Sequence, residues 1–267
     1  MLFRQLSAFI LIWIISFSAS AGERLPIVFA HGIWINPEVY EYLLPLKKTF
    51  QKYGYDVHIA RTPIGGTLEQ RSQVLESEIY RLVPHGRYHL IGHSMGGLDA
   101  RLAIDTYNLG ERCASLTTLA TPHYGSVIAD YVISNLDKTK AMEILEKLFA
   151  HDVQAVRQLT TTHMTQEFNS KVLDDKRVKY FSMGFFIPQP AYRYSVIPWL
   201  WFAHDIQSKA GFPLNDGMVS TQSSLWGESL GDYPGDHYTE TAPFPLGGDI
   251  MYDDVVKRVA ENLDLNF

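Results

Sequence analysis

The chain has 267 residues, of which 46% are hydrophobic and 13% aromatic, enough to fill one large core. Its formal net charge is -6, so it has no basic excess to neutralise a phosphate backbone, and nucleic acid is excluded as a partner. The same balance excludes binding to an anionic membrane by charge alone.

The first segment has the pattern of a signal peptide. Arg4 gives it a positive start, residues 6–17 form a short apolar run, and the small residues 19–21 suit a signal peptidase. The alternative, an uncleaved anchor, is disfavoured because the run is shorter than the roughly 20 residues that span hydrocarbon. We therefore predict a signal peptide over residues 1–21, one domain over residues 22–267, and an exported protein that is periplasmic or secreted.

Short β-rich runs then alternate with longer helical patterns. In chain order, strands are predicted at 26–30, 55–60, 88–91, 115–120 and 178–183, and helices at 39–53, 68–82, 96–109 and 252–263. This alternation predicts an α/β fold with a mostly parallel central sheet and helices on both faces. The single cysteine, Cys113, excludes an intramolecular disulfide and is expected to be a buried apolar residue.

Almost sixty residues separate the strands that end at 120 and begin at 178, more than such a connection needs. We interpret residues 126–170 as a helical lid insertion. Its apolar residues recur at helical spacing: Val127, Ile128, Tyr131, Val132, Met142, Leu145, Leu148 and Phe149. A lid face and ordinary core packing both fit this pattern, whereas core packing is the preferred interpretation of the aromatic stretch 185–202.

The chemistry centres on a G-x-S-x-G motif at residues 92–96. It follows an apolar strand and precedes a helical pattern, the context of a nucleophile elbow. Gly92 and Gly96 would let strand and helix approach while the hydroxyl of Ser94 projects outward. We predict Ser94 as the nucleophile.

A serine nucleophile needs a base and a group that orients that base. Asp216 precedes a glycine on a predicted loop, and His237 lies further on among turn-forming residues, in the chain order expected after Ser94. Ser94, Asp216 and His237 are therefore the predicted catalytic residues. The alternative acids are Asp205, Asp232 and Asp236. For His204 a surface or capping role is expected.

The oxyanion of an acyl-transfer reaction needs at least two N–H donors. Met95, directly after the nucleophile, is one predicted donor. The other is expected in the His31-Gly32 turn after the first strand, at Ile33 or alternatively Trp34. Our oxyanion-hole prediction is Ile33 and Met95.

Four blocks together, at residues 29–32, 92–101, 120–126 and 215–217, resemble the secreted bacterial triacylglycerol lipases. The resemblance implies the α/β-hydrolase fold, a lid that opens at a lipid surface, and hydrolysis of lipid carboxylic esters through an acyl-enzyme. It also implies a lipid or ester substrate at an interface, with peripheral membrane or lipid-droplet contact as a further expectation. The sequence sets neither the acyl-chain length nor the oligomeric state.

The sequence departs from this family where many members hold a structural Ca²⁺. The Asp that follows the catalytic histidine by two positions is replaced by Thr239, followed by Glu240. No acidic loop supplies the six or more oxygen ligands that Ca²⁺ requires, and no His or Cys cluster suits Zn²⁺. We therefore predict no cofactor and no metal, with a structural calcium ion as the disfavoured alternative.

Three alternatives to a triacylglycerol lipase remain. A soluble carboxylesterase, or a phospholipase or lipid acyltransferase, would use the same three residues on other acyl donors or acceptors. A non-catalytic lipid- or protein-binding module on a hydrolase scaffold would need no triad, because a fold does not guarantee a function.

Overall fold

The computed structural model describes residues 24–33, 43–136, 139, 152–190, 195, 197–241 and 252–266. The predicted signal peptide, Trp34 and the second apolar part of the predicted lid, residues 142–149, lie outside these residues.

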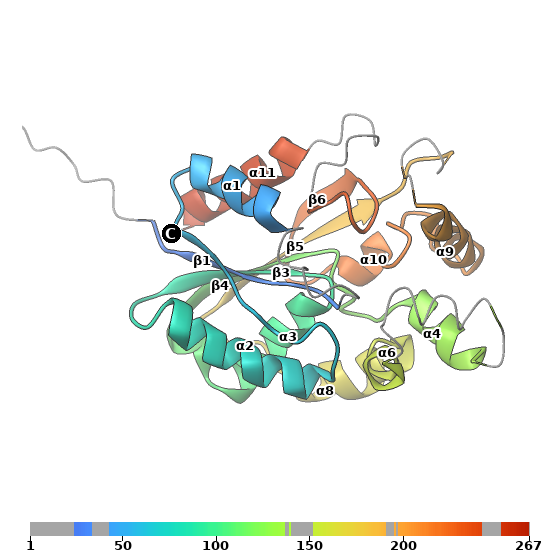
Figure 1. The fold of residues 1–267 in the computed structure, drawn as a ribbon, viewed down its shortest axis with the longest axis horizontal. Coiled ribbons are helices and arrows are strands. Elements are labelled where there is room, and N and C mark those ends of the chain that lie inside the picture. Colours follow the sequence, from blue (N-terminus) through green and yellow to red (C-terminus); the bar gives the residue numbers. More distant parts are fainter. Residues whose placement is uncertain are drawn as a thin grey trace, which may run out of the picture.

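Within the described part of the chain, six parallel strands form one sheet in the order β2-β1-β3-β4-β5-β6 (Figure 1). Their bounds are β1 Ile27–Ala30, β2 Val57–Ile59, β3 Tyr88–His93, β4 Cys113–Leu119, β5 Lys179–Phe186 and β6 Glu228–Pro234. The chain leaves β1 toward β2, then crosses back to β3, so the strand order reverses between β1 and β3, where Ala30 pairs with Gly92. In open α/β sheets ligands bind beyond the carboxyl ends of the strands at such a reversal, and Ser94 directly follows β3 there.

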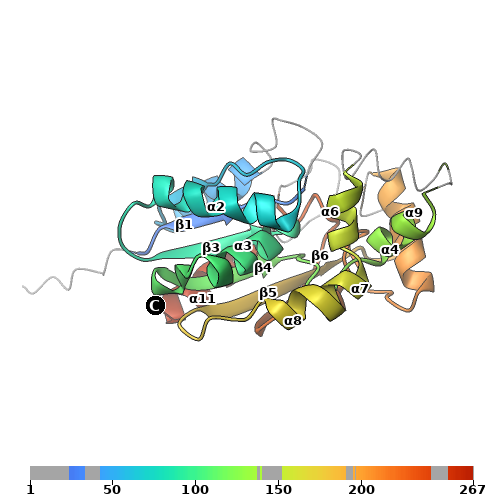
Figure 2. The ribbon, with the colours of Figure 1, turned by 90° about the horizontal axis from the view of Figure 1, so that it is seen from below.

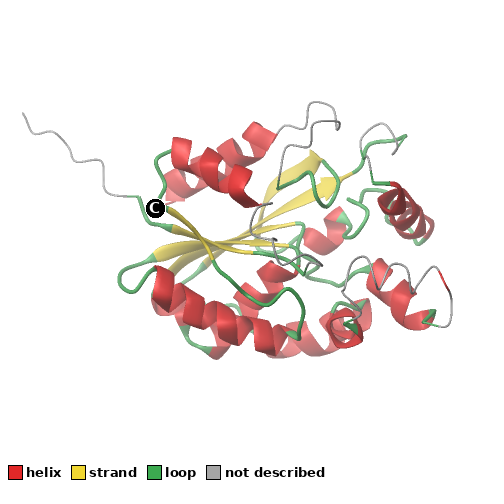
Figure 3. Cartoon of the chain, viewed as in Figure 1, coloured by secondary structure: helices red, strands yellow, loops and turns green. Residues whose placement is uncertain are grey.

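Helices cover both faces of the sheet, with α1 and α11 on one side and α2 and α3 on the other (Figures 1 and 2). Figure 3 shows that α4, α6 and α9 lie beyond the end of the sheet to which β3 points. The helix bounds are α1 Leu44–Lys52, α2 Leu68–Leu82, α3 Met95–Thr106, η2 Leu109–Glu111, α4 Val127–Ser134, α6 Val153–Gln158, α7 Thr161–His163, η3 Met164–Phe168, α8 Asn169–Lys171, α9 Pro198–Lys209, α10 Thr221–Ser224 and α11 Tyr252–Asn266.

Helix α2 begins with a capping box, which fixes where its first turn lies. The hydroxyl of Thr67 accepts from the backbone N–H of Gln70, and the Gln70 side chain accepts from the N–H of Thr67. The buried face that follows carries Leu68, Leu75 and an arginine, Arg71, whose side chain is fully buried.

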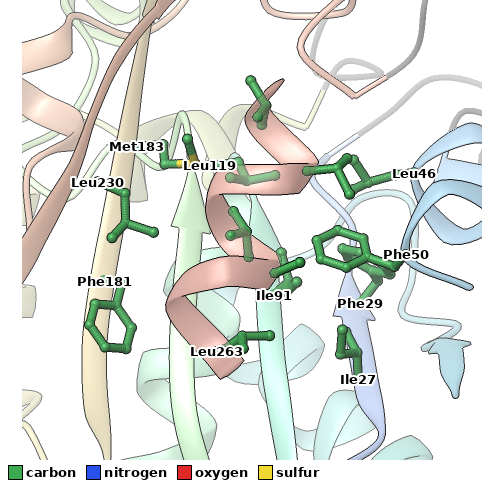
Figure 4. Packing of buried hydrophobic residues seen from close by; sticks show 14 of the residues in the cluster. Ile27, Phe29, Leu46, Phe50, Ile91, Leu119, Phe181, Met183, Leu230 and Leu263 are labelled. Carbon is green, nitrogen blue, oxygen red and sulfur yellow. The ribbon is translucent and has the colours of Figure 1, made fainter. Parts of the chain in front are cut away.

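The core on the α1 and α11 side is built from alternate residues of the central strands (Figure 4). Phe29 of β1 packs on Phe50 of α1, with ring centroids 5.7 Å apart. Val256 and Leu263 of α11 close the same cluster. Each such side chain contributes about 1.5–3 kcal/mol when it is fully buried, so the last helix is part of the core.

The predicted strands and helices are present, but β6 and α9 were not predicted. β6 is an edge strand whose sequence is polar, with only Leu230 buried, so it lacks the apolar pattern of the central strands. α9 lies partly within the stretch expected to be aromatic core packing. The surface role expected for His204 is wrong, because this α9 residue is 5% exposed and bonds to Gln189 and Ser208.

In the described part of the insertion, α4 is packed into the core. Ile128 and Val132 are fully buried in a cluster that also holds Met95, the residue after the nucleophile. The apolar face of α4 is therefore covered here, while a lid motion stays a prediction. No helix among the described residues has the length and apolar character to cross a bilayer.

Candidate active site

Ser94 lies on a strained turn between β3 and α3. Its backbone has φ 53° and ψ -131°, a conformation that a side-chain-bearing residue adopts only when its surroundings enforce it. The surroundings do so here. The N–H of Ser94 donates to the carbonyl of Leu119 at 2.9 Å, and the Thr121 hydroxyl donates to the Ser94 carbonyl at 2.8 Å.

Three glycines allow the strand and the helix to meet at this turn. A Cβ on Gly92 would lie 2.5 Å from the Cα of Gly97, and one on Gly96 would lie 2.3 Å from the Ala30 carbonyl oxygen. A Cβ on Gly97 would lie 2.2 Å from Oγ1 of Thr121. A side chain at Gly92 or Gly96 would push α3 away from β3 and β1, and one at Gly97 would push α3 away from β4 and Thr121. The requirement at Gly97 was not predicted.

The structure brings the three predicted catalytic side chains together. The Ser94 hydroxyl lies 2.9 Å from Nε2 of His237, to which it can donate its proton. Nδ1 of His237 lies 2.8 Å from Oδ2 of Asp216 and donates to it. Ser94 is 8% exposed, His237 7% and Asp216 0%, so all three residues are buried and the carboxylate lies deepest.

The Asp216 carboxylate is oriented by its own loop. Its Oδ1 accepts from the backbone N–H groups of Met218 and Val219, each at 2.7 Å, which leaves Oδ2 for the imidazole. Asn215 fixes the turn, because its side-chain oxygen accepts from the Gly217 N–H at 3.0 Å. The two groups that orient Asp216 are backbone N–H groups, which every residue type except proline supplies. The sequence therefore indicated this acid only through the Asn215-Asp216-Gly217 run.

The three alternative acids have other partners. Asp205 is exposed and pairs with Lys209 at 2.6 Å. Asp236 is buried, but its Oδ1 accepts from the backbone of Tyr238 and Thr239 and so closes the turn that carries the histidine. Asp232 lies on β6, where burial raises its pKa.

The two predicted oxyanion donors lie on either side of the nucleophile. Met95 is the first residue of α3, so its N–H is one of the free donors at the helix N-terminus. The loop with Ile33 approaches from β1, and a Cβ on Gly32 would lie 2.8 Å from Cβ and 3.3 Å from Oγ of Ser94. The alternative donor, Trp34, lies outside the described residues.

A buried carboxyl group next to the site was not predicted. Oε1 of Glu240 lies 2.5 Å from Nε2 of His93 and 3.5 Å from Nδ1 of His237. Burial, together with the negative charges of Asp216 and Asp236, raises the pKa of Glu240 well above its ordinary value. Burial likewise lowers the pKa of His93, so a neutral acid faces a neutral imidazole.

Among the described residues, His93, His237 and Glu240 form a group of the metal-ligand type, with ligand atoms within 4.8 Å of one another. Two ligands at about 2.0–2.1 Å in a tetrahedral site lie roughly 3.3 Å apart. The 2.5 Å between His93 and Glu240 is a hydrogen-bond distance, and both nitrogens of His237 already have partners. The cluster as it stands is a hydrogen-bonded network.

The sheet order, the strained serine after β3 and the helices on both faces define the class of protein: an α/β-hydrolase. Within that class, the chain belongs to the PGAP1-like alpha/beta domain family, whose model matches residues 48–208. The predicted fold class and lipase resemblance are confirmed at this level.

Similar proteins agree with this assignment. Triacylglycerol lipase 2 of Saccharomyces cerevisiae is 34% identical over 199 residues, covering 72% of this chain and 59% of the yeast protein. A triacylglycerol lipase of Pseudomonas fragi is 30% identical over 116 residues, covering 42% of this chain and 39% of that protein. The chain thus spans less than two thirds of the length of these relatives.

Two solved structures share the fold. The mature lipase BlEst2 of Bacillus licheniformis superposes with a TM-score of 0.70 at 23% identity, covering 91% of this chain and 93% of that one. The metagenomic carboxyl esterase MGS0156 superposes with a TM-score of 0.73 at 18% identity, covering 92% and 77%.

Proposed function

We propose that this protein is an exported serine hydrolase that cleaves the carboxylic esters of lipids through an acyl-enzyme. The observation that carries the proposal is the chain of hydrogen bonds from Ser94 through His237 to the buried Asp216, at 2.9 and 2.8 Å. A serine hydroxyl on a strained turn, a base within reach and a carboxylate behind that base are what acyl transfer requires.

In the first half-reaction, Oγ of Ser94 attacks the ester carbonyl carbon while Nε2 of His237 takes the hydroxyl proton. The carbonyl oxygen becomes an oxyanion, which the N–H groups of Met95 and Ile33 stabilise. The tetrahedral intermediate then collapses, the bond to the alkoxy oxygen breaks, and His237 gives its proton to the leaving alcohol. Asp216 stabilises the imidazolium throughout.

In the second half-reaction, water attacks the acyl-enzyme and passes a proton to His237. Collapse of the second intermediate returns that proton to Oγ of Ser94 and releases a carboxylic acid. Atoms balance as ester plus water giving acid plus alcohol, without a cofactor.

A lipid acyl chain is the proposed substrate group because partly buried apolar side chains pack against the cluster that contains Met95, the residue after the nucleophile. They include Ile33, Trp199 and Tyr238. The ring of Trp199 meets that of Tyr238 edge to face, at 5.8 Å between centroids. Such a surface takes up hydrocarbon and excludes water from the ester carbonyl. The lipase names of the similar proteins support the same substrate class.

The test compares Ser94→Ala with the wild-type protein. The substrates are p-nitrophenyl esters of rising chain length, emulsified triacylglycerol, phospholipid and short-chain soluble esters. Each assay is run with and without a chelator to test for a required metal ion. We expect loss of nearly all turnover and of labelling by a fluorophosphonate probe. Ser224→Ala is the matched control, since Ser224 is also buried, at 1% exposed, and its hydroxyl donates to the carbonyl of Ser220, the N-cap of its own short helix. Hydrolysis by Ser94→Ala at the wild-type rate contradicts the proposal.

Export and interfacial contact are separate parts of the proposal. Expression in a bacterial host should yield a mature chain that begins near Gly22 by mass spectrometry, because of the pattern in residues 1–21. Activity should rise when a triacylglycerol passes from solution to emulsion. A protein that retains Met1 would contradict export. Equal rates on dissolved and emulsified ester would contradict contact with a lipid interface.

A further inference from the structure

Arg71 is a buried arginine whose guanidinium reaches three segments at once. It lies in the first turns of α2 and is fully buried, as is its partner Asp99 on α3. Its Nε donates to Oδ2 of Asp99 at 2.9 Å, and its Nη2 forms an ion pair with the same oxygen at 2.8 Å. Nη2 also donates to the carbonyl of His31 at 2.7 Å, and Nη1 donates to the carbonyl of Pro63.

Two partners of Arg71, Asp99 and His31, lie on the two segments that contain the predicted oxyanion donors. Asp99 is on the helix that begins at Met95, directly after Ser94. His31 begins the turn that leads to Ile33, and its carbonyl also lies against the start of α3, where a Cβ on Gly96 would be 2.6 Å away. One buried guanidinium therefore connects the helix with one predicted donor to the loop with the other.

The next peptide of this loop is held by the His31 side chain. Nδ1 of His31 lies 2.7 Å from the Gly32 carbonyl, and Nε2 lies 2.9 Å from the Thr62 hydroxyl. Burial lowers the pKa of His31 to about 4, so the ring is neutral and carries one N–H. With that proton on Nδ1, the ring donates to the Gly32 carbonyl and Nε2 accepts from the Thr62 hydroxyl, while the Thr62 carbonyl lies 3.1 Å from Nε2.

These contacts set the direction of the N–H groups. In a trans peptide the C=O and the following N–H point in opposite directions. Because the His31 carbonyl faces Arg71 and the Gly32 carbonyl faces the His31 ring, the N–H groups of Gly32 and Ile33 are turned away from these partners. Oxyanion stabilisation is effective when donors are held in place before the reaction.

We propose that Arg71 is a positioning residue for ester hydrolysis, which, with Asp99 on the helix of the nucleophile, holds the His31-Gly32-Ile33 turn so that the Ile33 N–H is preorganised for the oxyanion. Arg71 touches no reacting atom. The inference rests on the proposed function and adds to it a residue outside the triad and the two donors.

The decisive variant is Arg71→Lys. A lysine keeps the positive charge beside Asp99, but its single nitrogen cannot serve Asp99, His31 and Pro63 together. We expect a folded protein whose kcat is reduced tenfold or more with KM within about twofold of wild type, since one lost oxyanion donor costs about 10²–10³ in kcat. The midpoint of the acidic limb of the kcat/KM profile should stay unchanged because the triad is untouched.

The affinity for a transition-state analogue separates a positioning role of Arg71 from a general loss of stability. A trifluoromethyl ketone adds to Ser94 and forms a tetrahedral oxyanion, so its affinity should fall in proportion to kcat. Arg101→Lys is the matched control: Arg101 is a second buried arginine, 1% exposed, and lies on α3 two residues after Asp99. Its side chain stacks on Trp226 and bonds to Asn169, away from the loop. This control should lose thermal stability while it keeps wild-type kcat and inhibitor affinity.

Thr62→Val gives an independent test, because it removes the hydroxyl bonded to His31 and leaves the Arg71–Asp99 pair intact. We expect a several-fold fall in kcat with KM unchanged. Wild-type kcat and inhibitor affinity in whichever of the two variants folds overturns the inference. If Ser94→Ala is inactive while these variants are wild type, only the inference fails; if the wild-type protein hydrolyses no ester, the proposed function fails first.

Discussion

Oε1 of Glu240 lies 2.5 Å from Nε2 of His93, although 147 residues separate them in the chain. The acid is also 3.5 Å from the imidazole of His237, which is close enough to change the pH profile if it carried a charge. The protonation state of Glu240 therefore decides whether this side chain affects the titration of His237 electrostatically or contributes only packing and a hydrogen bond.

We expect Glu240→Gln to leave kcat within about threefold of wild type, because the raised pKa of Glu240 keeps the carboxyl neutral and a neutral amide has the same shape. The midpoint of the acidic limb of kcat/KM should not move. Glu240→Ala, by contrast, leaves His93 without this partner in the interior and should cost about 1–3 kcal/mol of stability. A downward displacement of the acidic limb in Glu240→Gln would mean that the acid is ionised.

Asp216→Asn should lower kcat by about 10⁴ with little effect on stability. The amide oxygen can keep the two backbone donors at Met218 and Val219, which places the NH₂ group toward His237. The NH₂ group then donates to Nδ1, so the proton of the neutral ring lies on Nε2, which can no longer accept from Ser94. Steady-state kinetics with p-nitrophenyl esters measures this.

The matched control for that variant is Asp205→Asn, whose carboxylate is exposed and paired only with Lys209 at the surface. Exposed pairs of this kind contribute about 0–1 kcal/mol, so activity and stability should both stay near wild type. Unchanged kcat in Asp216→Asn would show that a different carboxyl group orients His237.

Gly97→Ala should impair both folding and activity. Its Cβ would lie 2.2 Å from Oγ1 of Thr121, the hydroxyl that donates to the Ser94 carbonyl. Overpacking at a buried position costs about 1–3 kcal/mol, and displacement of Thr121 should release the elbow, so kcat falls as well. Gly211→Ala, where the new Cβ has no neighbour within 4 Å, should change stability through its φ of +97° alone and leave kcat unchanged. Thermal unfolding and kinetics on both variants test this, and equal kcat in the two would contradict it.

Stability should fall on acidification through buried histidines. His89 is 2% exposed and bonds to the Ser115 hydroxyl, and burial lowers its pKa to about 4. Because the unfolded value is near 6.5, the unfolded chain takes up the proton first. The contribution of neutral His89 to the free energy of unfolding is therefore complete above pH 6.5. It falls by about 1.4 kcal/mol per pH unit down to about pH 4, a loss of roughly 3 kcal/mol in all.

The measurement is the difference in unfolding free energy between wild type and His89→Gln at several pH values. A difference is needed because Asp99, whose pKa burial raises to about 6, favours the folded state on acidification and so opposes the histidines. The advantage of wild type over the variant should shrink as pH falls from 6.5 to 4. A difference independent of pH in this window would refute the assignment.

The sequence predicted the sheet and the three triad candidates because their signals are local. Ser94 lies between glycines after an apolar strand, and Asp216 and His237 lie in turns with characteristic residues. The structure places these three side chains within hydrogen-bond distance of one another.

What the sequence did not reveal depends on contacts between distant segments. Arg71 and Glu240 look like ordinary charged helix and turn residues, and only the fold buries them beside His31 and His93. The edge strand β6 was missed for a related reason: a strand with one open side needs little apolar surface, so its residues resemble those of a loop.

The position of α11 has a consequence for biosynthesis. Val256 and Leu263 cover the same face of the sheet as Phe29 of the first strand, more than 220 residues earlier in the chain. The part of that apolar face beneath α11 stays uncovered until this helix has left the ribosome, so the nascent chain exposes apolar surface until then. A holding chaperone, or export before folding, would be most useful in that interval.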